Sequence, residues 1–328
     1  MKKIINHPND VVSECLKGIE LAHPALKYTP GVEVISKREK TAGKVGVVSG
    51  GGSGHEPAHA GYVGAGMLDA AVAGNMFSSP SPDRIIEGIK EADAGAGVLL
   101  VIKNYSGDIM NFEMAADMAE MEDIAVKHVV VRDDVAVPDS TYSTGRRGIA
   151  GTVFVHKIAG AKAASGAPLD AVQEAAQKAS DNIRSMGMAM TPCTLPAVGK
   201  AGFSLGENEV EIGMGIHGEP GVARTEVKTA KETAQILLDK ILEDYDFAGS
   251  EVALMVNGLG GTPLMELYIL NADVQDYLAT RGVKVYKTFV GNYMTAIEMA
   301  GCSLTLMKLD DELKALLDAS CDTPALKV

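Results

Sequence analysis

The sequence predicts an α/β protein with two α/β domains, each a largely parallel or mixed sheet flanked by helices. Short runs of β-branched and other apolar residues alternate with helical patterns, which is typical of α/β proteins. Several of these runs end in glycine-rich or polar loops. The chain has 328 residues, enough for two ordinary domains. We expect an N-terminal domain over residues 1–188 and a C-terminal domain over residues 189–328.

The N-terminal half contains a series of candidate buried strands and the helices between them. The strands are expected at Lys44–Ser49, Ala70–Ala73, Gly97–Ile102 and Val126–Val131. The helices are expected at Pro57–Gly66, Pro82–Ala92, Ile109–Glu122, Ala150–Gly160 and Leu169–Met186. Ser81 followed by Pro82 indicates a helix start, because serine caps free N–H groups and the missing N–H of proline is harmless in the first turn.

The C-terminal half begins a second series of the same kind. Its strands are expected at Glu209–Met214, Glu251–Val256, Lys284–Phe289 and Ser303–Lys308. Its helices are expected at Val227–Glu243, Pro263–Ala279 and Asp310–Ala319. The proline-containing stretch Thr191–Pro196 separates the two series and predicts the domain junction.

Composition and charge exclude several classes of protein. The formal net charge of -13 argues against a nucleic-acid binder, since phosphate backbones are held by clustered Lys and Arg. No run of about 18 apolar residues occurs, and no apolar core or cleavage site follows the basic start. We therefore expect no membrane segment and a cytoplasmic location. The cysteines lack C-x-x-C spacing, which predicts reduced packing residues: Cys15, Cys193, Cys302 and Cys321.

The segment from His55 to His59 matches H-E-x-x-H, the pattern of zinc peptidases. That chemistry requires both histidines on one face of a continuous helix. Pro57 is expected to be the first residue of a helix, which places His55 before it and breaks the spacing. We therefore predict no metal site, and His59 is expected to be a packing or structural histidine.

Two nucleotide-binding patterns are also incomplete. Gly213–Gly218 matches G-x-G-x-x-G, but Glu219-Pro220-Gly221 follows it as a turn where a dinucleotide site requires a helix. No segment matches the P-loop pattern G-x-x-x-x-G-K-[ST]. If the protein acts on a phosphoryl group, the phosphoryl donor is expected to be held elsewhere.

The segment Ser49–Pro57 is the first candidate ligand site. It has four glycines in five residues after a hydrophobic strand, so backbone N–H groups can approach a ligand closely. The N-terminus of the helix expected after it would add partial positive charge. A purely structural turn is the alternative, although it would need fewer glycines.

Two further loops carry reactive side chains. Lys103 and Asp108 bracket a loop at the carboxyl end of a predicted strand and could supply a cation and a base to one small ligand. The alternative is a solvent-exposed lysine and a helix cap at Asp108. His217 lies in the glycine-rich loop Gly215–Gly221, where few side chains surround it. It is better placed there to react or bind than to pack, although a lone histidine is often structural.

Together these segments resemble the substrate-binding subunit of dihydroxyacetone kinases. The matching stretches span most of the chain: GGGSGHEP (50–57), NMFSSPSPD (75–83), LVIKNYSGDIMNFE (100–113), DDVAV (133–137), GRRGIAGTV (145–153), GIHGEPG (215–221) and DTPAL (322–326). The resemblance implies two α/β domains, a homodimer and a ketone held covalently by a histidine, which corresponds to His217. His55 and Asp108 correspond to the other catalytic positions. The substrate-binding positions that it implies are Gly52, Ser53, Gly54, Phe77, Ser79, Lys103 and Asp108.

The covalent chemistry suits such a small ligand. Dihydroxyacetone has few atoms, so even at a ceiling of roughly 1.5 kcal/mol per atom ordinary contacts offer limited affinity. Attack of neutral His217 on the carbonyl gives a hemiaminal, and glycerol has no carbonyl to attack, so reactivity supplies the selectivity. Asp108 is expected to orient or deprotonate the attacking hydroxyl. His55 is expected to polarise the ketone oxygen or share that proton, and the sequence leaves open which residue is the base.

The resemblance also implies a partner and a rival function. Relatives that use ATP as one polypeptide carry a second, nucleotide-binding domain, which this length does not accommodate. We therefore expect a separate ADP-binding kinase subunit, recharged by a phosphoprotein of the phosphotransferase system, and no cofactor on this chain. Some relatives bind dihydroxyacetone without phosphorylating it and activate a transcription regulator. The presence of both His55 and Asp108 favours the kinase subunit over this sensor.

Overall fold

The computed structural model describes residues 2–139 and 145–328. These residues form two compact units that interleave along the chain. Unit 1 contains the segments Arg132–Gly151 and Asn182–Asp311, and unit 2 contains Lys2–Val131, Thr152–Asp181 and Glu312–Val328. The sequence prediction instead placed a single boundary between residues 188 and 189. The difference arises because the strand Ile183–Ala189 is an internal strand of the sheet in unit 1, so that unit resumes before it.

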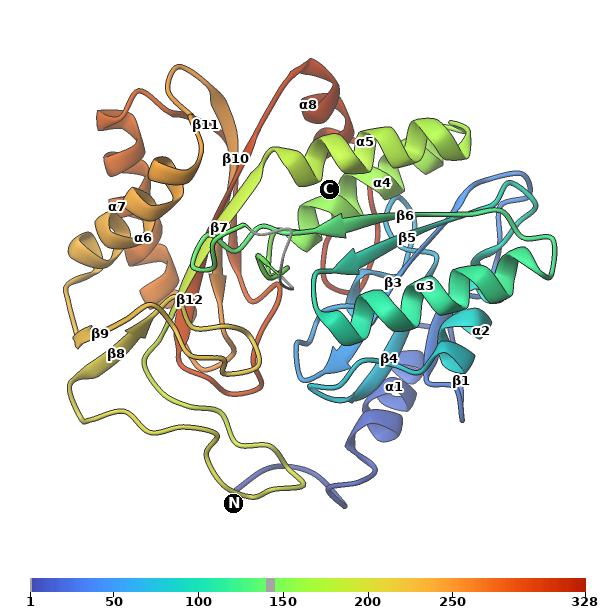
Figure 1. Ribbon diagram of the computed structural model, residues 1–328, viewed down its shortest axis with the longest axis horizontal. Helices are drawn as coiled ribbons and strands as arrows, with labels where there is room; N and C mark the ends of the chain where they lie inside the picture. The colour runs from blue at the N-terminus through green and yellow to red at the C-terminus, as the bar shows by residue number, and fades with distance from the viewer. Residues whose placement is uncertain (1, 140–144) are drawn as a thin grey trace. The chain divides into compact units, whose positions relative to one another are not determined.

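Unit 2 is built on a six-stranded mixed sheet with the order β1-β2-β4-β3-β5-β6 (Figure 1). Its strands are β1 (Leu26–Thr29), β2 (Val34–Lys37), β3 (Gly46–Ser53), β4 (Ala70–Met76), β5 (Val98–Lys103) and β6 (Val126–Val131). The four strands β4, β3, β5 and β6 pair in parallel, whereas β1 and β2 add antiparallel pairs at one edge. The carboxyl ends of the parallel strands therefore meet at one edge, where ligands bind in such sheets.

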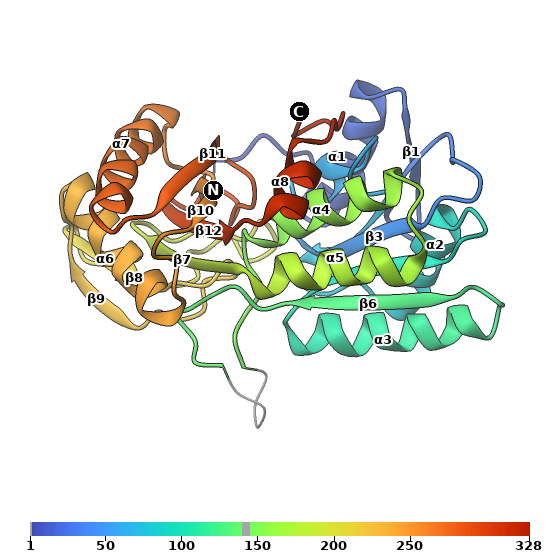
Figure 2. The ribbon, with the colours of Figure 1, turned by 90° about the horizontal axis from the view of Figure 1, so that it is seen from above.

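Helices cover both faces of this sheet (Figure 2). The helices of the unit are α1 (Val11–Ala22), α2 (Pro82–Ala92), α3 (Ser106–Glu120), α4 (Thr152–Ala164), α5 (Leu169–Asp181) and α8 (Asp311–Asp318), with a short 3-10 turn, η1 (Ala60–Tyr62). Helices α2 and α3 bury their apolar faces against side chains such as Val48, Leu100 and Ile102. Helices α4 and α5 pack together on the other face, in contact with β3, β5 and β6.

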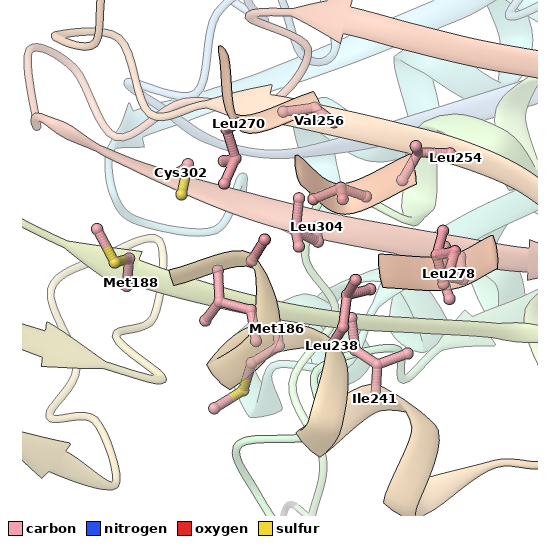
Figure 3. Close-up of a cluster of buried hydrophobic side chains, with 14 of the residues drawn as sticks. Met186, Met188, Leu238, Ile241, Leu254, Val256, Leu270, Leu278, Cys302 and Leu304 are labelled. Atoms are coloured by element: carbon pink, nitrogen blue, oxygen red, sulfur yellow. The ribbon is translucent and has the colours of Figure 1, made fainter. Parts of the chain in front are cut away.

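Unit 1 is built on a second six-stranded sheet with the order β11-β10-β12-β7-β8-β9. Its strands are β7 (Ile183–Ala189), β8 (Glu209–Ile212), β9 (Ala223–Glu226), β10 (Glu251–Gly258), β11 (Lys284–Gly291) and β12 (Gly301–Lys308), and its helices are α6 (Ala230–Asp244) and α7 (Leu264–Thr280). Both helices cover one face of the sheet. Their inward side chains, such as Leu238 and Leu278, gather with Leu254 and Leu304 of the strands (Figure 3). Both units confirm the predicted fold class of two helix-flanked mixed sheets.

One predicted helix is wrong and another is too long. Residues 57–66 form turns and η1, because glycines at 61, 64 and 66 disfavour a helix and Ala65 instead pairs with Asp322 of the DTPAL stretch. The helix expected at Leu169–Met186 ends at Asp181, and β7 follows. The residues of β7 also suit a helix, but backbone pairing with β8 and β12 decides their conformation. The prediction missed α1, β1, β2 and β9.

Candidate functional site

Gly50, Gly51 and Gly52 of the first motif lie in strand β3 and Gly54 follows its end, and the helix N-terminus expected beside them does not form. Close packing explains why these positions are glycine. A Cβ atom on Gly52 would lie 2.6 Å from the backbone nitrogen of Ser78 and 2.7 Å from the carbonyl carbon of Phe77. A Cβ atom on Gly51 would overlap the Nζ atom of Lys103. The bare strand thus lets the segment after β4 and the lysine of β5 approach it closely.

The segment after β4 brings further predicted residues to the same place. The Phe77 N–H donates to the Ser53 carbonyl at 2.9 Å, and the Phe77 ring stacks on His55 with ring centroids 5.1 Å apart. A Cβ atom on Gly54 would lie 2.7 Å from the Phe77 ring, so this position also needs glycine. Ser79 lies against Gly107 at the start of α3. Chain segments far apart in sequence therefore surround one small region.

Lys103 and Asp108 form a buried pair at the carboxyl end of β5. The side chain of Lys103 is fully buried, and that of Asp108 is nearly so. Lys103 Nζ lies 3.6 Å from Asp108 Oδ2, 3.2 Å from the Gly50 carbonyl oxygen and 2.9 Å from His59 Nε2. Asp108 Oδ1 has no hydrogen-bond partner among residues 2–139 and 145–328. This burial rules out the solvent-exposed lysine, and Asp108 is not the cap of α3, because the N-cap is Tyr105.

His59 belongs to this group, although the sequence predicts only a packing or structural histidine. Burial, together with the charge of Lys103, holds the pKa of His59 well below its usual value, so the ring is neutral. Burial also lowers the pKa of Lys103, and the charge of Asp108 opposes that change. The signal in the sequence was the presence of His59 beside His55 in the H-E-x-x-H match.

His217 lies in unit 1, in the loop that follows β8, and Glu219 fixes its ring. Glu219 accepts from the His217 ring at Nδ1 and from the His217 backbone N–H, each at 2.9 Å. Burial acts to raise the pKa of Glu219, but the hydrogen bond from His217 and the charges of His217 and Arg147 lower it to about 2. Since an ionised carboxylate can only accept, Nδ1 carries the proton, and in the neutral form of the ring the lone pair lies on Nε2.

Arg147 and Asp134 of unit 1 contact the start of this loop. The Arg147 guanidinium donates to Asp134 Oδ2 at 2.9 Å and to the Gly213 carbonyl at 2.8 Å. A Cβ atom on Gly215 would lie 2.6 Å from an Arg147 nitrogen, which explains why the loop needs glycine there. Glu219 and Arg147 were missed from the sequence, although both lie inside the GIHGEPG and GRRGIAGTV stretches that carried the resemblance.

The candidate residues thus fall into two groups, one in each unit. Unit 2 brings together Gly52, Ser53, Gly54, His55, Phe77, Ser79, Lys103 and Asp108. His217 belongs to unit 1. Within the described parts of the chain, no group of three or more His, Cys, Asp or Glu side chains could hold a metal ion. None of the helices described is both long and apolar enough to cross a membrane.

Comparisons with known proteins agree with these motifs. The family model of the Dak1 domain matches residues 17–325. The chain is 54% identical over 314 residues to the PTS-dependent dihydroxyacetone kinase 1, dihydroxyacetone-binding subunit DhaK, of Listeria innocua, covering 95% of each chain. Among solved structures, it matches the dihydroxyacetone kinase operon co-activator Dha-DhaQ with a TM-score of 0.90 and 39% identity, covering 95% of this chain and 96% of that one.

A second solved structure extends the comparison to a longer kinase. The dihydroxyacetone kinase of C. freundii in its native form matches with a TM-score of 0.90 and 35% identity, over 99% of this chain and 60% of that chain. The family model alone covers most of the sequence and includes every residue of both candidate groups. The resemblance seen in the motifs is therefore confirmed: the chain belongs to the Dak1 domain family.

Proposed function

We propose that this chain is the dihydroxyacetone-binding subunit of a phosphotransferase-dependent dihydroxyacetone kinase. It would hold dihydroxyacetone as a hemiaminal of His217 and present its terminal hydroxyl for phosphorylation to dihydroxyacetone phosphate. The observation that carries this proposal is the pairing of His217 with Glu219, which puts the lone pair of the ring on Nε2. The names of relatives that match along 95% of their length support the same assignment.

The capture step follows from this tautomer. The Nε2 lone pair of His217 forms a bond to the carbonyl carbon, and the π electrons of the C=O bond move to the oxygen. The ring would gain positive charge, which the neighbouring Glu219 carboxylate stabilises as the Nδ1 proton departs. The ketone oxygen takes up one proton, so the proton count is unchanged. Glycerol and other polyols lack the carbonyl and are not captured.

The transfer step uses the buried pair of unit 2. Asp108 Oδ1 is a buried acceptor without a partner among the described residues, so it can take the proton of the attacking hydroxyl. The ammonium group of Lys103 lies beside the other carboxylate oxygen and holds the side chain in place. His55, stacked on Phe77, would polarise the ketone oxygen. The main chain of Gly52, Ser53 and Gly54 would line the pocket.

The capture step is tested by intact mass spectrometry of the purified chain with dihydroxyacetone or glycerol. The wild-type chain should gain the mass of one dihydroxyacetone and nothing with glycerol. His217→Ala should show no adduct, whereas the control His128→Ala, which changes an exposed histidine of β6, should keep it. An adduct that survives in His217→Ala would remove His217 from the capture step.

The same proposal includes the source of the phosphoryl group and the subunits with which the chain assembles. The chain would act as a homodimer with a separate ADP-binding subunit, which a phosphoprotein of the phosphotransferase system recharges. The support is the name of the Listeria innocua relative, which is described as PTS-dependent and as a dihydroxyacetone-binding subunit.

The second candidate function is that of a ligand-binding coactivator of a transcription regulator. The observation in its favour is the TM-score of 0.90 to the co-activator Dha-DhaQ. A coactivator needs the capture residue His217 but has no use for a buried proton acceptor at the hydroxyl. The buried Lys103–Asp108 pair therefore favours the kinase subunit. Turnover with the partner subunits separates the two functions, because a coactivator would hold the ligand and form no product.

A further inference from the structure

The ammonium group of Lys103 has three N–H donors and three nearby acceptors. Two acceptors lie within hydrogen-bond distance, the Gly50 carbonyl oxygen at 3.2 Å and His59 Nε2 at 2.9 Å. The third, Asp108 Oδ2, lies at 3.6 Å. If two N–H groups of Lys103 point to the Gly50 carbonyl and to His59, the third is directed toward Asp108. The backbone carbonyl cannot change its charge and Asp108 is the proposed base, so His59 is the member of this set that still lacks an assigned role.

The contacts of His59 define both its charge and its tautomer. In its ammonium form Lys103 can only donate, so in that form His59 Nε2 is the accepting nitrogen and Nδ1 carries the proton. Nδ1 lies 3.3 Å from Ser49 Oγ, and that hydroxyl donates to the Val101 carbonyl at 2.7 Å. The chain of donors and acceptors therefore runs without conflict from Val101 through Ser49 and His59 to Lys103.

The surroundings keep His59 neutral. Besides Lys103, His156 of α4 faces the ring edge-on, with ring centroids 5.1 Å apart, and His55 acts on it through its charge. Burial lowers the pKa of His156 to about 3, so this ring is neutral as well. The titratable groups that face Lys103 are thus Asp108 from α3, His59 from the segment after β3, and His156 from α4.

We propose that His59 is a positioning residue: its neutral ring accepts from Lys103, keeps that buried amine protonated and holds it beside Asp108. This inference rests on the proposed function, in which Asp108 takes the hydroxyl proton. A hydrogen bond accepted from the ammonium form favours that form over the neutral amine. Removal of the acceptor therefore lets Lys103 lose its proton at a lower pH, and the Asp108 carboxylate loses its cationic partner.

Two substitutions of His59 distinguish the loss of its hydrogen-bond acceptor from the loss of its ring volume. In His59→Gln the side-chain amide reaches about as far as Nε2 and can accept from Lys103. In His59→Asn the amide is shorter and can contact Ser49 but not Lys103. Ser49→Ala is a second, independent variant, because it removes the acceptor of Nδ1 without touching His59. Circular dichroism confirms that each full-length variant is folded.

The titration of Lys103 is measured by ¹⁵N NMR of the lysine side chains, with the signal identified from its loss in Lys103→Met. We expect Lys103 to deprotonate about one to two pH units lower in His59→Asn than in the wild type. His59→Gln should titrate close to the wild type, and Ser49→Ala should shift less than His59→Asn in the same direction. Equal titration of Lys103 in all four proteins would overturn the proposal.

Turnover with the partner subunits gives the second readout. In His59→Asn, kcat should fall about 10- to 100-fold with a smaller change in KM, and the alkaline limb of its pH profile should move to lower pH. His59→Gln should restore most of kcat. A wild-type kcat and pH profile in His59→Asn would contradict the proposal. Absence of product with the wild-type chain would instead end the proposed function, and the NMR titration would still decide the role of His59.

Discussion

At the residue scale, neighbouring side chains decide which atoms of the reactive groups are available. Glu219 accepts a hydrogen bond from His217 and so fixes the proton on Nδ1. In the same way, His59 accepts a hydrogen bond from Lys103 and so keeps the amine protonated. The sequence predicted His217, Lys103 and Asp108 as reactive groups, but it gave His59 only a packing or structural role and did not single out Glu219. A pattern of residue types shows which chemistry is present, whereas tautomer and charge depend on contacts that only folding creates.

Asp108→Asn should separate capture from transfer. The variant should form the dihydroxyacetone adduct like the wild type, because His217 and Glu219 are unchanged. Its phosphoryl transfer should fall about 100- to 10,000-fold, since an amide oxygen cannot take the hydroxyl proton. Adduct mass and product formation measure the two steps. The control Asp117→Asn changes an exposed residue of the same helix and should keep full activity, and full activity in Asp108→Asn would end its assignment as the base.

Glu219→Gln should weaken the capture of dihydroxyacetone at neutral pH, because the charge that stabilises the reacting ring is lost.

The same substitution should change how the free energy of unfolding depends on pH in acid. The pKa of Glu219 is lowered from 4.5 to about 2, so its contribution to the free energy of unfolding is present above pH 4.5 and is lost as the pH falls through about 2. That contribution is roughly 3 kcal/mol at most. Urea unfolding between pH 5 and pH 2 measures it, and an identical pH dependence in both proteins would contradict this role.

At the element scale, the sequence predicted those elements whose pattern agrees with their packing. The buried run of β5 and the start of α2 at Ser81-Pro82 were predicted to within a residue or two, although the Ser81 side chain makes no capping hydrogen bond. The helix predicted at 57–66 does not form because most of its backbone hydrogen bonds close tighter 3-10 turns, such as the bond from the Tyr62 N–H to the His59 carbonyl at 3.0 Å. Strand β7 failed because its residues carry no strong strand preference, and pairing with two neighbours decides its conformation.

Gly52→Ala tests whether the glycines of β3 serve close packing. The added methyl group would press on the backbone of Phe77 and Ser78, so the segment after β4 must shift. We expect a loss of roughly 1–3 kcal/mol in the free energy of unfolding and weaker binding of dihydroxyacetone. Gly18→Ala is the matched control, because nothing lies within 4 Å of its added atom and it is in helix α1, so it should be neutral or stabilising. Equal stability of the two variants would contradict the packing role.

At the scale of the whole molecule, the two-sheet α/β architecture followed from the alternation of strands and helices. The interleaving of the two units did not, because no local pattern shows which strand joins which sheet. The proposed function assigns the capture of the ketone to His217 of unit 1 and the proton transfer to Asp108 of unit 2. An activity that needs both residues tests this assignment.

The most direct test is a phosphoryl-transfer assay on the full-length chain with dihydroxyacetone, the ADP-binding subunit and its recharging phosphoproteins. Formation of dihydroxyacetone phosphate is followed with a coupled dehydrogenase, and adduct mass is recorded on the same samples. We predict product that depends on this chain and is lost in Asp108→Asn, although the adduct remains. A chain that carries the adduct in the complete mixture and yields no product would contradict the account and identify a ligand sensor.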